Sequence, residues 1–481
     1  MNINQNVLSG NSRNLRMLCS LVHLLFLSSI QLLAVGSSHA QEVQFQPATT
    51  VQLPVFGVSV NADGVLEHVQ FAPAGGQIFF ERARAAAVRM DQDLLKQSPL
   101  RKVSLKRLQA AIESQLDNGQ ELPDEILKLA GLQRIEYVFA FPDKNDVVIA
   151  GPAEGWVQNA GGRTVGITSG RPVVLLEDLL TAMRIYAQDL APKTWVGCSI
   201  GSTTEGRRRL SELERTLPRQ ISQRDEQAYA EWIVPQIEEA LGEAVVSVFG
   251  IPDKTNMVRV LLEADFRMKL IAIGREPPPI EMPTFIGKLK GAPRNNFQRW
   301  WFTPNYKCVQ VSDDKLSFQM VGQGVQLGTE EYKQDGQGNL IQKKTKPLRA
   351  ARLYAEAFTK DYEKIAAASP VFGQLRNMID VLIVANYIQR ERLFERAGLD
   401  PVTLLDNEKI PVDIHEPASG ASSLANAQWK NNRMVAPAGG VCVVPAEALR
   451  ESNLLKGGEA KLLEAKVKIA LPADEDAWWW D

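Results

Sequence analysis

The sequence predicts an α+β protein, in which duplicated helix–β-hairpin units share an antiparallel or mixed sheet. The run VFAFPDKNDVVIAGPAEGW begins at Val138, and a second run, VFGIPDKTNMVRVLLEADF, begins at Val248. Each places a Pro-Asp-Lys turn between two apolar stretches, and each follows a helical stretch that ends at glycine. We therefore expect two αββ units, followed by a further hairpin and a helical-hairpin region. Two copies are too few for a solenoid array.

The chain before the first unit predicts one hairpin and three helices. VFGVSV and VLEHVQF flank an Asn-Ala-Asp-Gly turn at 61–64. A helix is expected after Gly76, a second from a Ser104 cap to Gly119, and a short third between 123 and 131. Between the two units, Ser-Thr-Thr-Glu at 202–205 reads as a capping box.

The chain after the second unit begins at a Pro-Pro-Pro boundary, 277–279. A hairpin is expected around Asp313-Asp314, and the polar stretch 329–346 predicts an exposed loop. Two helices should follow, one over 351–365 and one from Phe372 to about Leu393, separated by Ser-Pro at 369–370. GGVCVVP at 439–445 predicts one more strand.

Residues 1–40 predict a cleaved signal peptide, because Arg13 and Arg16 precede an apolar run and Ser38-His39-Ala40 fits a cleavage site. A membrane anchor is the alternative, but polar residues interrupt the run. The expected product is exported to the periplasm or the exterior, with no membrane span after cleavage. We expect segments at 41–195 (hairpin, helices, first unit), 196–288 (second unit), 289–420 (hairpin and two long helices) and 421–481 (strand and tail).

Composition and charge exclude several classes of protein. Apolar content is 45% and the formal net charge is −2, which argues against nucleic acid as a partner. After cleavage, Cys198, Cys308 and Cys442 remain, so the chain is not a disulfide scaffold.

Histidine is scarce in the sequence. Only His68 and His415 remain after cleavage, and HExxH, paired Cys-x-x-Cys, Gly-x-Ser-x-Gly and the Walker loop are all absent. We expect no metal site and no cofactor. A Ser-His-Asp triad would depend on one of these two histidines, both in turn-rich surroundings.

Carboxylates leave a hydrolase hypothesis open. Glu154 lies in GPAEGW beside Trp156, and Asp265 occupies nearly the equivalent place in the second copy. A carboxylate next to an indole suits a general acid, or a sugar site with Trp156 as its platform. The alternative is that both residues complete strand packing. Asp265, Arg267 and Lys269 alternate with apolar residues, which predicts a strand with one charged face; Arg267 is a candidate binding residue on that face.

The tail ADEDAWWWD is the most unusual stretch. Exposed aromatic residues are a liability, so Trp478, Trp479 and Trp480 are expected to dock, either on this chain or on a partner.

Five stretches in combination resemble an exported planctomycete family known only as a domain of unknown function. They are GLQRIEYVFAFPDKNDVVIAGPAEGW, GRPVVLLEDLL, GIPDKTNMVRVLLEADFRMKLIAIG, RWWF and SPVFGQLRNMIDVLIVANYI, within about 75–395. The family pattern has Asp-Pro where Gly201-Ser202 stand. The resemblance implies export and a recurring architecture, but no activity and no site residue.

The sequence therefore favours a non-catalytic protein of the envelope or exterior that binds or scaffolds another macromolecule, either a protein or a polysaccharide. Two alternatives stay open. One is a glycan hydrolase that uses Glu154 and Asp265. The other is a small-ligand module with an apolar pocket between the two hairpins.

Overall fold

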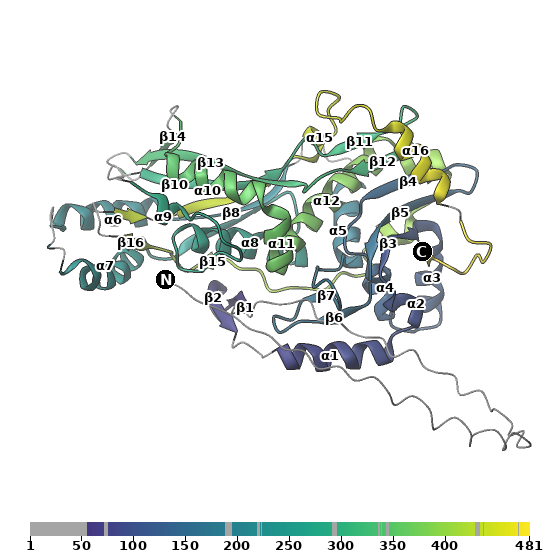
Figure 1. Cartoon of the computed structure of the whole chain (residues 1–481), viewed down its shortest axis with the longest axis horizontal. Coiled ribbons are helices and arrows are strands. Elements are labelled where there is room, and N and C mark those ends of the chain that lie inside the picture. Colours follow the sequence, from purple (N-terminus) through teal and green to yellow (C-terminus); the bar gives the residue numbers. More distant parts are fainter. Residues whose placement is uncertain are drawn as a thin grey trace, which may run out of the picture. The chain divides into compact units, whose positions relative to one another are not determined.

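The fold is seen in a computed structural model (Figure 1). It describes residues 55–71, 76–187, 195–218, 222, 224–290, 296–334, 337, 339–342, 346–428, 433–435, 437–469 and 471–481. These residues belong to one of the chain's two units, Gln46–Asp481. The predicted signal peptide, 1–40, lies outside the described residues.

The larger sheet has nine strands in the order β1-β2-β15-β9-β8-β18-β10-β13-β14. It is mixed, because β10 pairs in parallel with β18 and β15 pairs in parallel with β2, whereas the other pairs are antiparallel. Its strands are β1 (Val55–Val60), β2 (Val65–Phe71), β8 (Val196–Gly201), β9 (Ala244–Phe249), β10 (Asn296–Pro304), β13 (Val325–Gln334), β14 (Leu340–Gln342), β15 (Gly420–Ala421) and β18 (Pro437–Val443).

The smaller sheet has six strands in the order β11-β12-β4-β5-β3-β19, and all its pairs are antiparallel. They are β3 (Ser98–Ser104), β4 (Tyr137–Phe141), β5 (Asp146–Ala153), β11 (Val309–Val311), β12 (Ser317–Met320) and β19 (Trp479–Trp480). Two further pairs stand apart, formed by β6 (Trp156–Gln158) with β7 (Thr164–Gly166), and by β16 (Asn426–Gln428) with β17 (Arg433–Val435).

Helices make up the rest of the regular structure, so the predicted α+β class is confirmed. They are α1 (Gly76–Arg89), α2 (Gln92–Leu95), α3 (Leu105–Asp117), α4 (Asp124–Leu127), the 3₁₀ turn η1 (Leu129–Gly131), α5 (Leu176–Ala187), α6 (Thr204–Thr216), α7 (Glu226–Leu241), α8 (Asn256–Ala272), α9 (Phe285–Lys288), α10 (Arg349–Lys360), α11 (Tyr362–Ala368), α12 (Pro370–Arg390), α13 (Leu393–Ala397), α14 (Val402–Leu405), α15 (Pro445–Ala448) and α16 (Glu459–Lys468).

Helices α8 and α10 cover one face of the larger sheet. Side chains alternate along each strand, so every second residue faces these helices. Trp300 and Phe302 of β10 are fully buried on this side, where their rings contact Tyr354 and Phe358 of α10. The Tyr354 hydroxyl donates to the Met268 carbonyl at 2.7 Å, which ties α10 to α8.

Helix α12 is deeply buried, with every residue from Val371 to Ile388 buried. A helix that is apolar on all sides requires neighbours on all sides, and α12 packs against α5, α8, α11 and α15. Its few charged side chains are paired: Asp380 accepts from Arg134 Nε at 2.6 Å.

The first predicted unit is confirmed, but the second is wrong. β4 and β5 form the hairpin expected around Pro142, and Asn145 closes its turn with a left-handed φ of 52°. In the second copy, Thr255 stands at the equivalent position and is extended, with φ −102° and ψ 154°. A β-branched residue is strongly disfavoured at positive φ, so the chain does not reverse there. It enters helix α8 instead.

The duplication therefore stops after one strand. β9 lies in the nine-stranded sheet and the first hairpin lies in the six-stranded sheet, so the two copies share no sheet. Two further predictions need correction. The stretch 329–346 includes the end of β13 and all of β14, and the helix expected over 351–365 is broken at Asp361 into α10 and α11.

Candidate functional site

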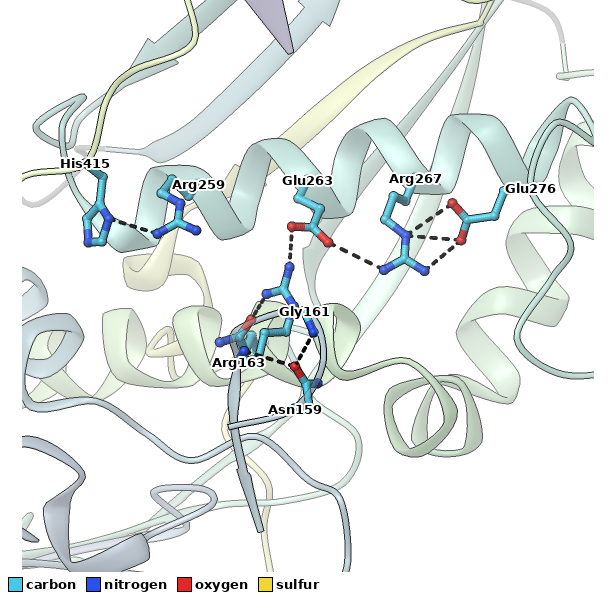
Figure 2. Close-up of polar contacts among 9 residues, drawn as sticks. Asn159, Gly161, Arg163, Arg259, Glu263, Arg267, Glu276 and His415 are labelled. Carbon is cyan, nitrogen blue, oxygen red and sulfur yellow. Dashed lines mark hydrogen bonds and ion pairs between the residues drawn. The ribbon is translucent and has the colours of Figure 1, made fainter. Parts of the chain in front are cut away.

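Helix α8 carries a row of charged residues on one face. Arg259, Glu263 and Arg267 follow one another at intervals of four residues, which places their side chains in line along the helix. Figure 2 shows this row, with His415 beyond one end and Glu276 beyond the other. We call Arg259, Glu263, Arg267 and Glu276, with Arg163 opposite them, the α8 charge row.

Arg267 and Glu276 form the most buried ion pair of the row. Arg267 Nη2 donates to Glu276 Oε1 at 2.7 Å, and Arg267 Nε lies 3.1 and 3.2 Å from the two carboxylate oxygens. Burial opposes the charge on the guanidinium, but Glu276 and Glu263 outweigh burial and raise the pKa of Arg267. The Arg267 guanidinium therefore keeps its positive charge in buried surroundings.

Arg163 reaches the row from the turn between β6 and β7. The Asn159 side chain shapes this turn, because its Oδ1 accepts from the backbone N–H groups of Gly161 and Arg163 at 3.0 Å each. The Arg163 guanidinium then bonds both Glu263 and Gln374 of α12, as Figure 2 shows for Glu263. The contact joins three segments that are far apart in the sequence.

His68 and His415, the two histidines among the described residues, lie at opposite ends of the α8 charge row. His68 Nε2 is 3.3 Å from Glu276 Oε2. At the other end, His415 Nδ1 is 2.9 Å from Arg259 Nη1, and His415 Nε2 is 3.3 Å from Glu177 Oε2. Arginine only donates, so His415 Nδ1 must accept and Nε2 must carry the proton that faces Glu177.

A second carboxyl lies next to Glu177. Asp178 is 1% exposed, and Asn256 Nδ2 donates to its two oxygens at 3.2 and 3.1 Å. Burial and the neighbouring Glu177 raise the pKa of Asp178 well above its ordinary value, so this group favours the protonated form. Burial likewise raises the pKa of Glu177, partly offset by His415.

The opposite side of α8 faces β8 and β18. Lys269 Nζ donates to Asp265 Oδ2 and to the Ile200 carbonyl, both at 2.7 Å. A Cβ at Gly439 of β18 would lie 2.2 Å from the Trp300 carbonyl oxygen and 3.2 Å from both Asp265 Oδ1 and Lys269 Cε, so the Trp300 backbone requires a glycine there. A cavity of about 20 Å³ beside Lys269, Ser422 and Ser423 has room for a single water molecule.

These positions correct the strand predicted over Asp265, Arg267 and Lys269. The segment is helical, so Arg267 faces Glu276 whereas Asp265 and Lys269 face the sheet, and all three are buried. Arg267 does not lie on a charged surface. Sequence spacing held the correct signal, because Arg259, Glu263 and Arg267 have a period of four.

Glu154 lies in a separate network. Its Oε1 accepts from Gln133 Nε2 at 2.7 Å and from the Ser169 backbone N–H at 2.9 Å, and its Oε2 accepts from Gln97 Nε2 at 2.9 Å. Trp156 begins β6 and is 6% exposed, so it packs in the core. Glu154 is 2% exposed and Asp265 is 0% exposed, and they bond to different partners, Gln133 and Lys269 respectively. This geometry gives the hydrolase hypothesis no support.

The predicted docking of the tail occurs within the chain. β19, which consists of Trp479 and Trp480, pairs with β3 at the edge of the six-stranded sheet. Trp478 is 6% exposed, and its carbonyl accepts from the Ser104 N–H at 2.9 Å. The apolar pocket predicted between two hairpins cannot form as expected, because the second hairpin does not form.

The face of the larger sheet turned away from α8 is partly exposed. Trp301, Gly440, Ser199 and Ser247 stand in one cross-strand row, and paired residues share a face. We call this surface the open sheet face, defined by the half-buried or exposed residues Ser199, Gly201, Val245, Ser247, Phe249, Arg299, Trp301 and Cys442.

Two aromatic groups flank the open sheet face. On β10, the guanidinium of Arg299 lies 4.8 Å from the Trp301 ring and 5.1 Å from the Tyr332 ring. On the β9 side, the rings of Phe249 and Trp195 are 4.3 Å apart, and Trp195 is 39% exposed. Sequence analysis did not single out this surface, because strand order alone brings β9, β8, β18 and β10 together.

Across the described residues, no group of histidine, cysteine or acidic side chains is arranged to hold a metal ion. None of the helices described is both long enough and apolar enough to cross a membrane.

Comparison with known proteins gives one match. No curated protein and no solved structure matches the chain. Residues 198–285, which run from β8 through α8 to the start of α9, match the family model described as a protein of unknown function, DUF1598.

Proposed function

We propose that the protein is a non-catalytic binding protein whose recognition surface is the open sheet face. The observation that carries the proposal is the cross-strand row from Trp301 to Ser247, flanked by aromatic side chains. Val245, the second residue of β9, is 48% exposed. Partly exposed aromatic and aliphatic side chains gathered on a flat surface are typical of a macromolecular interface.

The buried charges fit this function better than they fit catalysis. Glu154, Asp265 and Glu263 are each occupied by donors from the same chain and have almost no contact with solvent. A catalytic carboxylate must reach its substrate within hydrogen-bond distance. These groups instead hold segments of the chain together.

Site-specific photocrosslinking tests the function. A photoreactive residue placed at Ser247 should crosslink to one partner in the native setting, identified by mass spectrometry. A matched probe at the exposed Lys461 of α16 should not crosslink to it. Equal capture at both positions, or no product at Ser247, would refute the proposal. If the wild-type protein binds insoluble polysaccharide and the Trp301→Ala variant does not, the partner is instead a glycan.

Export belongs to the same proposal. An envelope or extracellular partner requires removal of residues 1–40 and a mature chain that starts at Gln41. N-terminal sequencing of the protein recovered from the native envelope or medium tests this. An uncleaved Met1 end on exported material would contradict the predicted processing.

A further inference from the structure

The open sheet face has the dimensions and chemistry of a surface for a helix. We propose that its occupant is an amphipathic α-helix of a partner protein that places an acidic side chain against Arg299. The inference rests on the proposed binding function and names the class of partner.

The sheet already receives a helix on its covered face. There α8 packs across β8 and β18, and Asp265 and Lys269 lie close to Gly439. The strand pairs of the sheet are mostly antiparallel, and such sheets commonly pack one face on the core and leave the other open to solvent or to a partner. On the open sheet face, the next residue of β18 is again a glycine, Gly440, and it is covered by the Trp301 ring.

The width between the two aromatic groups matches a helix. The Trp301 ring covers Gly440 of β18, so the open width is the two strand spacings from β18 across β8 to β9, which amount to ~10 Å. A helix with its side chains is about 10–12 Å across. The floor between the groups is low, because Ser199 is small and a Cβ at Gly201 would meet nothing within 4 Å. An added β-strand would need a sheet edge, which this surface is not.

Arg299 specifies the charge of the partner. Its Nε is buried without a hydrogen-bond partner in the described part of the chain, and Nη2 reaches the Ser199 hydroxyl only at 3.5 Å. No ion pair of Arg299 occurs among the described residues. The guanidinium lies between two rings and hydrogen-bonds Tyr332, and its terminal N–H groups suit a carboxylate, which can accept from two N–H groups at once. A nucleic acid would need several cations to contact successive phosphates.

Synthetic peptides of about 18 residues test the helix. One amphipathic helical peptide carries Glu at the centre of its apolar face; matched versions carry Lys there, or a central Pro that breaks the helix. Binding to the purified protein is measured by fluorescence anisotropy. The Glu peptide should bind at least tenfold more tightly than the Lys and Pro peptides. Arg299→Gln should remove the preference for Glu over Lys.

Gly201→Trp provides a second variant, because its side chain would enter open space and so should leave the fold intact. Gly201→Trp should lower the affinity for the Glu peptide at least tenfold. Arg208→Gln, on the exposed and ion-paired face of α6, should leave this affinity unchanged. Bound peptide should also slow alkylation of Cys442, which lies on the face, while Cys198 and Cys308 are buried.

The outcomes separate this inference from the proposed function. Suppose that a partner crosslinks at Ser247. If no helical peptide binds, or if the Lys peptide binds as tightly as the Glu peptide, the proposal of an acidic helical partner is refuted, whereas the proposed binding function stands. If neither crosslink nor peptide binding occurs, both fail.

Discussion

Arg101 and Asp481 link the segment 471–481 to β3. Arg101 Nε and Nη2 donate to the two oxygens of the Asp481 side chain at 2.8 and 3.0 Å. The same guanidinium is fully buried, donates to the Ala130 carbonyl at 2.7 Å and lies 4.6 Å from the Trp479 ring. Arg107 adds bonds to the carbonyls of Pro472, Asp474 and Ala477. The C-terminal tail, residues 471–481, is thus a structural part of the six-stranded sheet.

Asp481→Asn should lower the free energy of unfolding by about 1–2 kcal/mol, since it removes a charge-assisted pair that is partly exposed. Burial raises the pKa of Asp481, but the bonds from Arg101 outweigh this and leave the pKa lowered. The contribution is therefore complete above the ordinary value of 3.8 and is lost as pH falls through the lowered pKa. Urea unfolding at several pH values measures it. Asp476→Asn, which breaks no ion pair, is the control; equal effects would contradict the prediction.

Deletion of residues 474–481 should make the protein self-associate. β19 covers β3, and without it the N–H and C=O groups of Lys102 and Val103 lie at a sheet edge. Light scattering should show a molecular mass that rises with concentration. Full-length Asp481→Asn keeps the covering strand and should keep the mass of the wild type. A truncated chain of unchanged mass would show that the edge is protected by other means.

The α8 charge row predicts a large cost for removing one charge. Glu263→Ala leaves Arg163 and Arg267 with fewer acidic partners in buried surroundings, so we expect a loss of about 3 kcal/mol. Denaturant unfolding measures the loss. Glu205→Ala removes an exposed partner of Arg208 on α6 and should change stability much less. If Glu263→Ala and Glu205→Ala lowered the free energy of unfolding by similar amounts, burial of the α8 charge row would not add to the cost of removing a charge.

Asp178 predicts a pH dependence of the opposite sign to that of Asp481. Its pKa is raised by burial, so the folded state binds more protons than the unfolded state, and stability falls as pH rises above 3.8. Asp178→Asn keeps the amide partner and should remove this loss, so the variant gains stability over the wild type with increasing pH. Glu451→Gln, at an exposed position, is the control. A difference that does not change with pH would contradict the raised pKa.

The parts of the fold that sequence predicted are those fixed by local chemistry. The hairpin turn at 61–64 and the Ser104 cap, whose side chain accepts from the Arg107 N–H, are set by residues a few positions apart. The docking of the tail was expected from its aromatic residues. The α8 charge row was not, because Arg163, Glu263, Glu276 and Gln374 come together only in the tertiary structure. The open sheet face was missed for the same reason.

The hairpin predicted in the second copy does not form, and the residue at one position, Asn145 in the first copy and Thr255 in the second, accounts for the difference. Asn145 has φ 52° and donates to the Gly398 carbonyl at 3.3 Å, whereas Thr255 is extended and precedes α8. Asn145→Thr forces a β-branched residue into the left-handed region and should cost about 1–2 kcal/mol. Thr255→Asn should be nearly neutral, because Asn is a good N-cap residue. Thermal unfolding of both variants measures the asymmetry. Equal losses would mean that these residues do not decide between hairpin and helix after the shared Pro-Asp-Lys sequence.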